Sequence, residues 1–295
     1  MKSFPSSTIF GCRSAVIAGL AAAISLTVSA AMATGRINVQ EGADNNNFDN
    51  PFVQPQDPAE AGGGRDQSLQ NGDVLIGTKR DDIQIGRLGV DILIGNNGRD
   101  VQIGGLEHFT DGPNRSDRAF GGGRQDVFLW KPGDGSDFFD GGRNDDAIVL
   151  GLVGEPGADG QPEFAVVNDD QAGVVFLDPH TGLPLVDVTN SPGFCPVIDA
   201  GSSDDAADQL AALGLDHLVQ FVLRGVRNAF EAGTQKEDNG LRVTLHLKDV
   251  EYVVCASREG GVIEVIDLRQ SPPMVGTLND IGDRRLRKRL KDMVL

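Results

Sequence analysis

A nine-residue period runs through part of this chain and constrains its fold more than any other feature. Three residue types, glycine, aspartate and isoleucine, keep the same step over four consecutive units. The glycines are Gly77, Gly86, Gly95 and Gly104, the aspartates are Asp73, Asp82, Asp91 and Asp100, and the isoleucines are Ile76, Ile85, Ile94 and Ile103. A fixed short period predicts one small structural unit that is stacked on copies of itself.

Each unit divides into a turn and a short strand. In residues 95–103 the first six positions are rich in Gly, Asn and Asp, which suit tight turns, and the last three are mostly apolar. A three-residue strand is not stable alone, but stacked strands pair at a spacing of about 4.8 Å. We therefore expect residues 68–150 to form a stack of short, paired strands.

The acidic position of the repeat suggests the function of the stack. The period breaks at residues 106–111, where we expect a loop, and then returns. Eight aspartates occupy the acidic position, namely Asp73, Asp82, Asp91, Asp100, Asp117, Asp126, Asp137 and Asp146. Carboxylates about 5 Å apart repel by about 1 kcal/mol per pair in water, and by several times more where they are partly buried. Calcium, a hard ion that accepts roughly six to eight oxygen ligands, would relieve this repulsion.

These units resemble the RTX nonapeptide GGxGxDxUx of hemolysin-type proteins, which builds a calcium-binding parallel β-roll. The resemblance implies that successive turns alternate between two edges, and that calcium lies between neighbouring turns of one edge. Aspartate carboxylates and backbone carbonyls would hold the ion. The implied pairs are Asp73 with Asp91, Asp82 with Asp100, Asp117 with Asp137, and Asp126 with Asp146. The alternative is a metal-free solenoid whose aspartates only cap turns.

Some positions match the motif well and others depart from it. The turns nearest to the motif contain Gly89, Gly98, Gly135 and Asn144, which complete the candidate calcium residues. Arginine replaces the fourth-position glycine at Arg80, Arg115 and Arg124, so distorted turns are expected there.

Two glutamines occupy a position that normally points an apolar side chain inward. Gln84 and Gln102 lie eighteen residues apart and so fall on one sheet. Either they form a hydrogen-bonded pair inside the stack, or that sheet is flipped and its isoleucines and valines face the core. We favour the first, because the sheet of Leu75 and Leu93 keeps the usual order.

The rest of the chain divides into three further regions. Residues 1–33 have the basic flank, apolar stretch and small-residue cleavage site of a secretory signal, with an uncleaved membrane anchor as the alternative. Residues 34–67 are polar and rich in Gly, Asn and Pro, as in a disordered linker. We expect residues 151–295 to form an α+β domain. The predicted fold is thus mainly β, a parallel β-roll solenoid followed by an α+β C-terminal domain.

The C-terminal region contains several predicted elements. Ser203 is expected to cap a helix that runs through Leu213, followed by a second helical turn at 216–222. Strands are expected at residues 241–247, 250–255 and 262–268, and a basic, solvated helix at 283–291, or alternatively a dedicated basic binding patch. Cleavage of the signal leaves Cys195 and Cys255, which favour one disulfide over two buried thiols.

Composition and missing motifs narrow the function. A net charge of −17 disfavours nucleic acid as a partner and favours cations. The sequence contains neither H-E-x-x-H nor G-x-S-x-G. The sequence therefore predicts a secreted or periplasmic calcium-binding protein, without stable membrane insertion after signal cleavage. Its role would be binding or structural, with an unknown protein or surface as partner. The alternative is a secreted enzyme whose active site lies in the C-terminal domain.

Overall fold

The computed structural model describes residues 37–41, 73–88, 90–106, 116–132, 134–156, 162–163, 175–223, 241–257 and 261–295. The predicted signal at 1–33, most of the predicted linker, and the candidate residue Gly89 lie outside the described residues. So does the predicted loop at 106–111, except for Leu106.

The nine-residue units fold into short parallel strands that alternate between two sheets. The units in the first sheet, sheet A, are β3 (Asp82–Leu88), β5 (Val101–Leu106), β7 (Val127–Trp130) and β9 (Ala147–Leu150). Those in the second sheet, sheet B, are β2 (Val74–Ile76), β4 (Ile92–Asn97), β6 (Arg118–Gly123) and β8 (Phe138–Arg143). Every neighbouring pair within these two sets is parallel. The chain therefore crosses from one sheet to the other at each turn.

The strand register follows the sequence period. Ile83 pairs with Val101 and Leu75 with Leu93, each eighteen residues ahead. Across the break the step lengthens, since Val101 pairs with Val127. The stack thus continues in register although the chain contains extra residues between β5 and β6.

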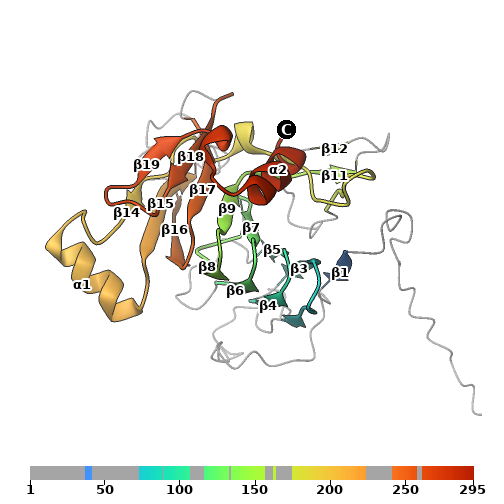
Figure 1. Ribbon diagram of the computed structural model, residues 1–295, viewed down its shortest axis with the longest axis horizontal. Helices are drawn as coiled ribbons and strands as arrows, with labels where there is room; N and C mark the ends of the chain where they lie inside the picture. Colours follow the sequence, from blue (N-terminus) through green and yellow to red (C-terminus); the bar gives the residue numbers. More distant parts are fainter. Residues whose placement is uncertain are drawn as a thin grey trace, which may run out of the picture.

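Both sheets continue past residue 150 into the predicted C-terminal domain. The order of sheet A is β1-β3-β5-β7-β9-β17-β18-β19, and that of sheet B is β14-β15-β16-β8-β6-β4-β2. Parallel pairing joins β16 (Leu241–Lys248) to β8 and β17 (Tyr252–Ala256) to β9. Figure 1 shows the green strands of the repeat followed by the orange and red strands of the C-terminal region. The chain is therefore mainly β, with parallel strands in mixed sheets.

Antiparallel strands complete the C-terminal ends of both sheets. In sheet A these are β18 (Ile263–Asp267) and β19 (Met274–Gly276), and in sheet B they are β14 (Val197–Ile198) and β15 (His217–Leu223). Small two-stranded pairs join β10 (Leu152–Val153) to β13 (Val186–Asp187) and β11 (Glu155–Pro156) to β12 (Pro162–Glu163). The short 3₁₀ helices are η2 (Val188–Asn190) and η4 (Leu278–Asp280).

The strands and the first helix predicted for the C-terminal region are confirmed. One helical turn predicted there, and part of the predicted linker, are wrong. The strands expected at 241–247, 250–255 and 262–268 are β16, β17 and β18, and Ser203 caps α1 (Asp204–Leu213). The helical turn expected at 216–222 is wrong, because this segment is β15 and pairs along its whole length with β16. The linker prediction is wrong for Asn38–Glu41, which form β1 and pair in parallel with β3.

Two apolar layers bury both faces of sheet A. Between the sheets lies one cluster that includes Leu93, Phe128, Phe139, Ile148 and Val253. On the other face, strand residues such as Ile83, Val101 and Val127 share a second cluster with residues of β13, η2 and α2 (Arg284–Met293). This second layer explains why β7, β9 and β17 of sheet A are apolar at nearly every position.

The favoured interpretation of the buried glutamines, a hydrogen-bonded pair inside the stack, is confirmed, and the sheet is not flipped. Gln102 Nε2 donates to Gln84 Oε1 at 2.8 Å, and Gln84 Nε2 donates to Gln40 Oε1 at 3.0 Å. The two amides also donate to the carbonyl oxygens of Ile94 and Phe120 in sheet B, so they point between the sheets. The isoleucines and valines of β3 and β5 nevertheless face a core, because the C-terminal region covers the outer face of their sheet.

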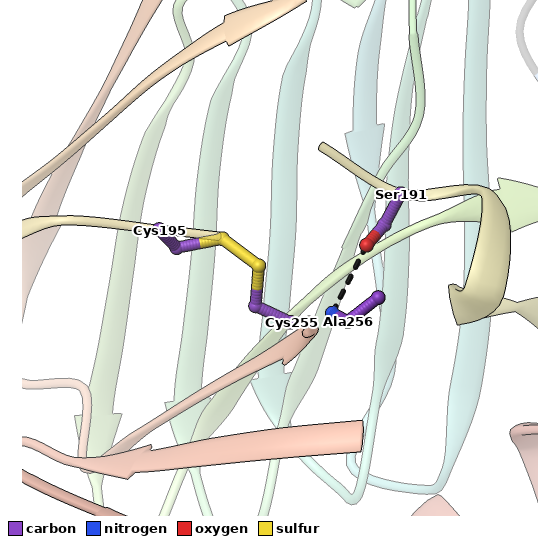
Figure 2. The surroundings of a disulfide bond; sticks show 4 residues. All are labelled: Ser191, Cys195, Cys255 and Ala256. Carbon is purple, nitrogen blue, oxygen red and sulfur yellow. Dashed lines mark hydrogen bonds between the residues drawn. A yellow bond between two sulfur atoms is a disulfide. The ribbon is translucent and has the colours of Figure 1, made fainter. Parts of the chain in front are cut away.

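The predicted disulfide is present. Cys195, ahead of β14, is bonded to Cys255 of β17 across a separation of sixty residues. Figure 2 shows the bond beside a hydrogen bond in which the Ala256 amide donates to Ser191 Oγ at 3.0 Å. Both interactions fasten the segment ahead of β14 to the strand that continues sheet A beyond the repeat.

Candidate metal centre

Acidic side chains form a ladder along each edge of the stack. The first ladder, at turns leading into sheet B, consists of Asp73, Asp91, Asp117 and Asp137. The second ladder, at turns leading into sheet A, consists of Asp82, Asp100, Asp126, Asp146 and Glu251. Every acid directly precedes a strand or lies at its first residue, so the alternation of strands between the sheets places successive acids on opposite edges.

One hydrogen bond is repeated along both ladders. The backbone N–H of each acid except the last donates to a carboxylate oxygen of the next acid on the same edge. On the second ladder the distances are 2.8 Å from Asp82 to Asp100, 2.7 Å from Asp100 to Asp126 and 2.6 Å from Asp126 to Asp146. The four pairs expected from the sequence are therefore bonded neighbours.

The structure adds links that the sequence did not predict. Asp91 bonds to Asp117, and Asp100 bonds to Asp126, across the break in the period. At its ends the second ladder gains two members from outside the repeat. Asn38 Nδ2 donates to Asp82 Oδ1 at 2.7 Å, and the Asp146 N–H donates to Glu251 Oε2 at 2.6 Å. In the sequence, Glu251 could have been recognised as an acid that directly precedes an apolar strand, although its turn lacks the glycines of the motif.

The second carboxylate oxygen on three rungs of the second ladder lacks a hydrogen bond. These atoms are Oδ2 of Asp100, Asp126 and Asp146, which are buried and have no hydrogen-bond partner among the described residues. Burial of an unpartnered carboxylate oxygen is costly, and such atoms in native proteins call for a counter-ion or another explanation.

Main-chain carbonyl oxygens lie close to these unpartnered atoms. A Cβ on Gly121 would lie 2.5 Å from Asp126 Oδ2 and 2.7 Å from the Gly141 carbonyl oxygen of the next rung. Gly95 has the same relation to Asp100 Oδ2 and the Gly121 carbonyl oxygen. The first glycine of each turn therefore leaves a small space into which a carboxylate oxygen and a carbonyl oxygen converge.

Burial raises the pKa of three aspartates in the second ladder. It raises the pKa of Asp100 to about 7, of Asp126 to about 8 and of Asp146 to about 10. The adjacent acid on the ladder adds to each increase, whereas the accepted backbone hydrogen bond opposes it. Burial also raises the pKa of Glu251 to about 7. Proton uptake by these carboxylates, or binding of a cation beside them, would relieve the free-energy cost of burying their charge.

Arg289 of α2 provides a positive charge on this edge. Its side chain is buried, and Nη1 donates to the carbonyl oxygens of Asp100 and Gln125 at 3.2 Å each. The guanidinium opposes the pKa increase of Asp100 and Asp126, while burial lowers its own pKa to about 10. One buried arginine thus offsets part of the charge of a ladder with five acidic members.

The first ladder ends in a separate buried group. Asp134 and Asp137 are both buried, and each has one carboxylate oxygen without a hydrogen-bond partner in the described part of the chain. Lys131 Nζ lies 3.8 Å from Asp134 Oδ1. Burial raises the pKa of Asp134 to about 8, and burial with the charges of Asp117 and Asp134 raises the pKa of Asp137. Asp134 was missed because it lies outside the acidic position.

Gly98, Gly135 and Asn144, the described turn residues that the sequence singled out, determine the backbone conformation of the turns. Gly135 and Asn144 have positive φ angles of 79° and 86°, and a Cβ on Gly98 would meet the Arg80 carbonyl oxygen. Asn144 Oδ1 also accepts from the Arg124 N–H at 3.3 Å. Arg124 keeps the left-handed conformation at a φ of 86° although it replaces glycine, and it leaves the ladder beside it intact. Arg115 lies outside the described residues.

The donor set of the second ladder fits a hard cation. Within the described part of the chain, no three His, Cys, Asp or Glu side chains lie close enough together to hold a metal ion. A site here would therefore combine carboxylate oxygens with main-chain carbonyls, as calcium accepts. Zinc prefers nitrogen or sulfur ligands, and magnesium requires a tighter octahedron. The unpartnered oxygens and the space beside each first glycine fit calcium.

A polar cluster in the C-terminal region bears on the enzyme alternative. Ser271 Oγ and Ser202 Oγ donate to the Asp199 carboxylate at 2.6 and 2.8 Å. His217 lies close enough to Asp199 for the carboxylate charge to favour the protonated imidazole. Burial lowers the pKa of His217, which is bonded to the Leu268 carbonyl. Within the described residues His217 makes no hydrogen bond with either serine, so the cluster lacks the nucleophile–base contact of a catalytic triad.

Comparison with known protein families, with curated proteins and with solved structures finds no match to this chain. Among the described residues, no helix is both long enough and apolar enough to span a membrane.

Proposed function

We propose that this chain is an exported calcium-binding protein of the RTX type. Its repeat is a parallel β-roll in which calcium binds between neighbouring turns of each edge. The unpartnered, buried Oδ2 atoms of Asp100, Asp126 and Asp146 carry this proposal. Each of these rungs places a main-chain carbonyl oxygen near the free carboxylate oxygen, which is the mixed oxygen set that calcium accepts.

Calcium binding would be coupled to folding. The ligands come from different rungs, and therefore the unfolded chain has no preformed site. Sites of extracellular type have dissociation constants of roughly 10⁻⁴–10⁻³ M, a range in which calcium outside the cell would occupy them. We further propose a binding or structural role, in which the C-terminal region contacts a protein or surface partner.

Calorimetric titration of the signal-free chain with calcium tests this proposal. We expect several ions to bind per chain, with Asp126→Asn binding fewer because it loses the charge of the carboxylate that links its rung to the rung of Asp100. Asp208→Asn on α1 is the matched control, since it removes the same charge from an exposed position. The absence of calcium binding by the wild-type chain would reject the proposal.

A further inference from the structure

The last step of the second ladder is formed by two segments that lie far apart in the sequence. The Asp146 N–H donates to Glu251 Oε2 at 2.6 Å across 105 residues. In return, the Glu251 and Tyr252 amides both donate to the Asp146 carbonyl oxygen at 3.1 Å. The turn at 249–251 therefore occupies the place of one more repeat turn, although it has no nonapeptide sequence.

Oxygen atoms converge in the same way at this step as within the repeat. Around the position of a Cβ on Gly141, the nearest atom is the Asp249 carbonyl oxygen, and Asp146 Oδ2 lies at 2.8 Å. Asp146 is fully buried, and its Oδ2 has no hydrogen-bond partner among the described residues. This oxygen therefore points into a space that the C-terminal segment completes.

The nearby cations are engaged on the outer side of the turns. Arg269 donates two hydrogen bonds to Asp267, at 2.9 and 2.6 Å, and its Nη1 lies 3.8 Å from Asp145. Lys248 Nζ donates to Asp140 at 2.7 Å and lies 3.4 Å from Asp249 Oδ2. Among the described residues neither cation donates a hydrogen bond to Asp146 or Glu251, and both side chains are close to half exposed. The last step of the second ladder thus brings together the carboxylates of Asp146 and Glu251. Asp145 and Asp249 flank them in sequence.

We propose that a calcium ion binds between the turn at 141–146 and the turn at 249–251, held by the carboxylates of Asp146 and Glu251 and the Asp249 carbonyl oxygen. This inference rests on the proposed function. The turn after Lys248 is three residues shorter than the turn after Asp140, with which Lys248 pairs. The longer glutamate side chain compensates for that shorter turn. The ion would fasten the C-terminal strands to the last repeat rung.

The variant Glu251→Gln tests this site. The glutamine amide oxygen can still accept from the Asp146 N–H, so the substitution removes only the charge. Calcium titration should show one ion fewer per chain than in the wild type, whereas Asp208→Asn should bind the wild-type number. Calcium should also slow amide hydrogen exchange in β17 of the wild type, and this slowing should be lost in Glu251→Gln.

The outcomes separate this inference from the proposed function. A wild-type chain that binds no calcium rejects both. A Glu251→Gln variant that binds as many ions as the wild type, with equal calcium-dependent protection of β17, overturns the junction site alone. Should the variant not fold, wild-type hydrogen exchange decides: calcium that protects the repeat strands and leaves β17 unchanged also overturns the junction site.

Discussion

At the residue scale, the first glycine of each turn and the acid that ends the turn depend on each other. The acid folds back over its own turn, so that the carboxylate lies where a side chain on the glycine would be. At Gly121 a Cβ would come within 2.5 Å of Asp126 Oδ2, closer than Cβ atoms are found in proteins. The repeat therefore keeps glycine here because the space belongs to the carboxylate and, in our proposal, to its ion.

Two alanine substitutions in one turn distinguish this requirement from a general loss of glycine. We expect Gly121→Ala to lower the free energy of unfolding by about 1–3 kcal/mol, as overpacked sites do, and to weaken calcium binding. Gly123→Ala is the control, because its nearest atoms lie 3.8 Å or more away and it should be close to neutral. Urea unfolding with and without calcium measures both, and equal effects would contradict the argument.

Single residues show where sequence reasoning succeeded and where it stopped. The period identified the eight aspartates, and the alternating edges that the RTX resemblance implies paired each of them with an aspartate eighteen or twenty residues away. It did not identify Glu251, Asn38 or Asp134, which join or extend the ladders without the motif. Their positions depend on strand pairing over long separations, and local spacing carries no information about such pairing.

At the element scale, α2 is a structural part of the stack. A solvated basic helix was predicted, but Leu286 and Leu290, four residues apart, are both fully buried. The solvated character is wrong for Arg289, which is buried against the turn carbonyls of the second ladder. Helical spacing alone could not separate this arginine from its exposed neighbours.

Removal of the buried arginine should be costly. We expect Arg289→Met to lower the free energy of unfolding of the metal-free protein by about 3 kcal/mol, because the acids it faces lose their buried partner. Lys288→Met is the control. Lys288 is exposed and forms a surface ion pair with Asp292, so its loss should change stability by less than about 0.5 kcal/mol. Comparable losses in chemical denaturation would show that α2 contributes packing alone.

In the C-terminal region, β16 and α1 were predicted correctly and β15 was not. Alternation of apolar and polar residues predicted β16, and a serine cap predicted α1. In β15 the buried residues Leu218 and Phe221 fitted a helical spacing, but Val219 between them is also buried, and pairing with β16 decides for a strand. A short apolar segment can match both the helical and the strand period, and therefore tertiary contacts determine which structure forms.

At the scale of the whole molecule, the ladders couple stability to pH. In the metal-free protein Asp100, Asp126, Asp146 and Glu251 have pKa values between about 7 and about 10, far above the unfolded value of about 4. The folded state therefore holds protons that the unfolded state has released, and stability falls as pH rises through these pKa values.

We thus expect the metal-free protein to lose stability between about pH 7 and about pH 9, by up to about 1.4 kcal/mol per pH unit for each acid concerned. The Asp146→Asn variant should show a shallower slope, since the amide cannot release a proton. In saturating calcium the slope should flatten or reverse, because the ion binds the ionised carboxylates. Thermal unfolding across this range, in chelator and in calcium, gives the comparison. A metal-free protein that is equally stable at both ends would contradict the raised pKa values.

The central claim is that calcium neutralises the acidic ladders and keeps the rungs stacked. The melting temperature of the signal-free chain, measured at neutral pH in calcium and in excess chelator, tests it most directly. We predict a lower melting temperature in chelator, restored by added calcium and not by equal magnesium. An unchanged melting temperature in chelator would mean that the ladders are stable without an ion, and it would contradict the account.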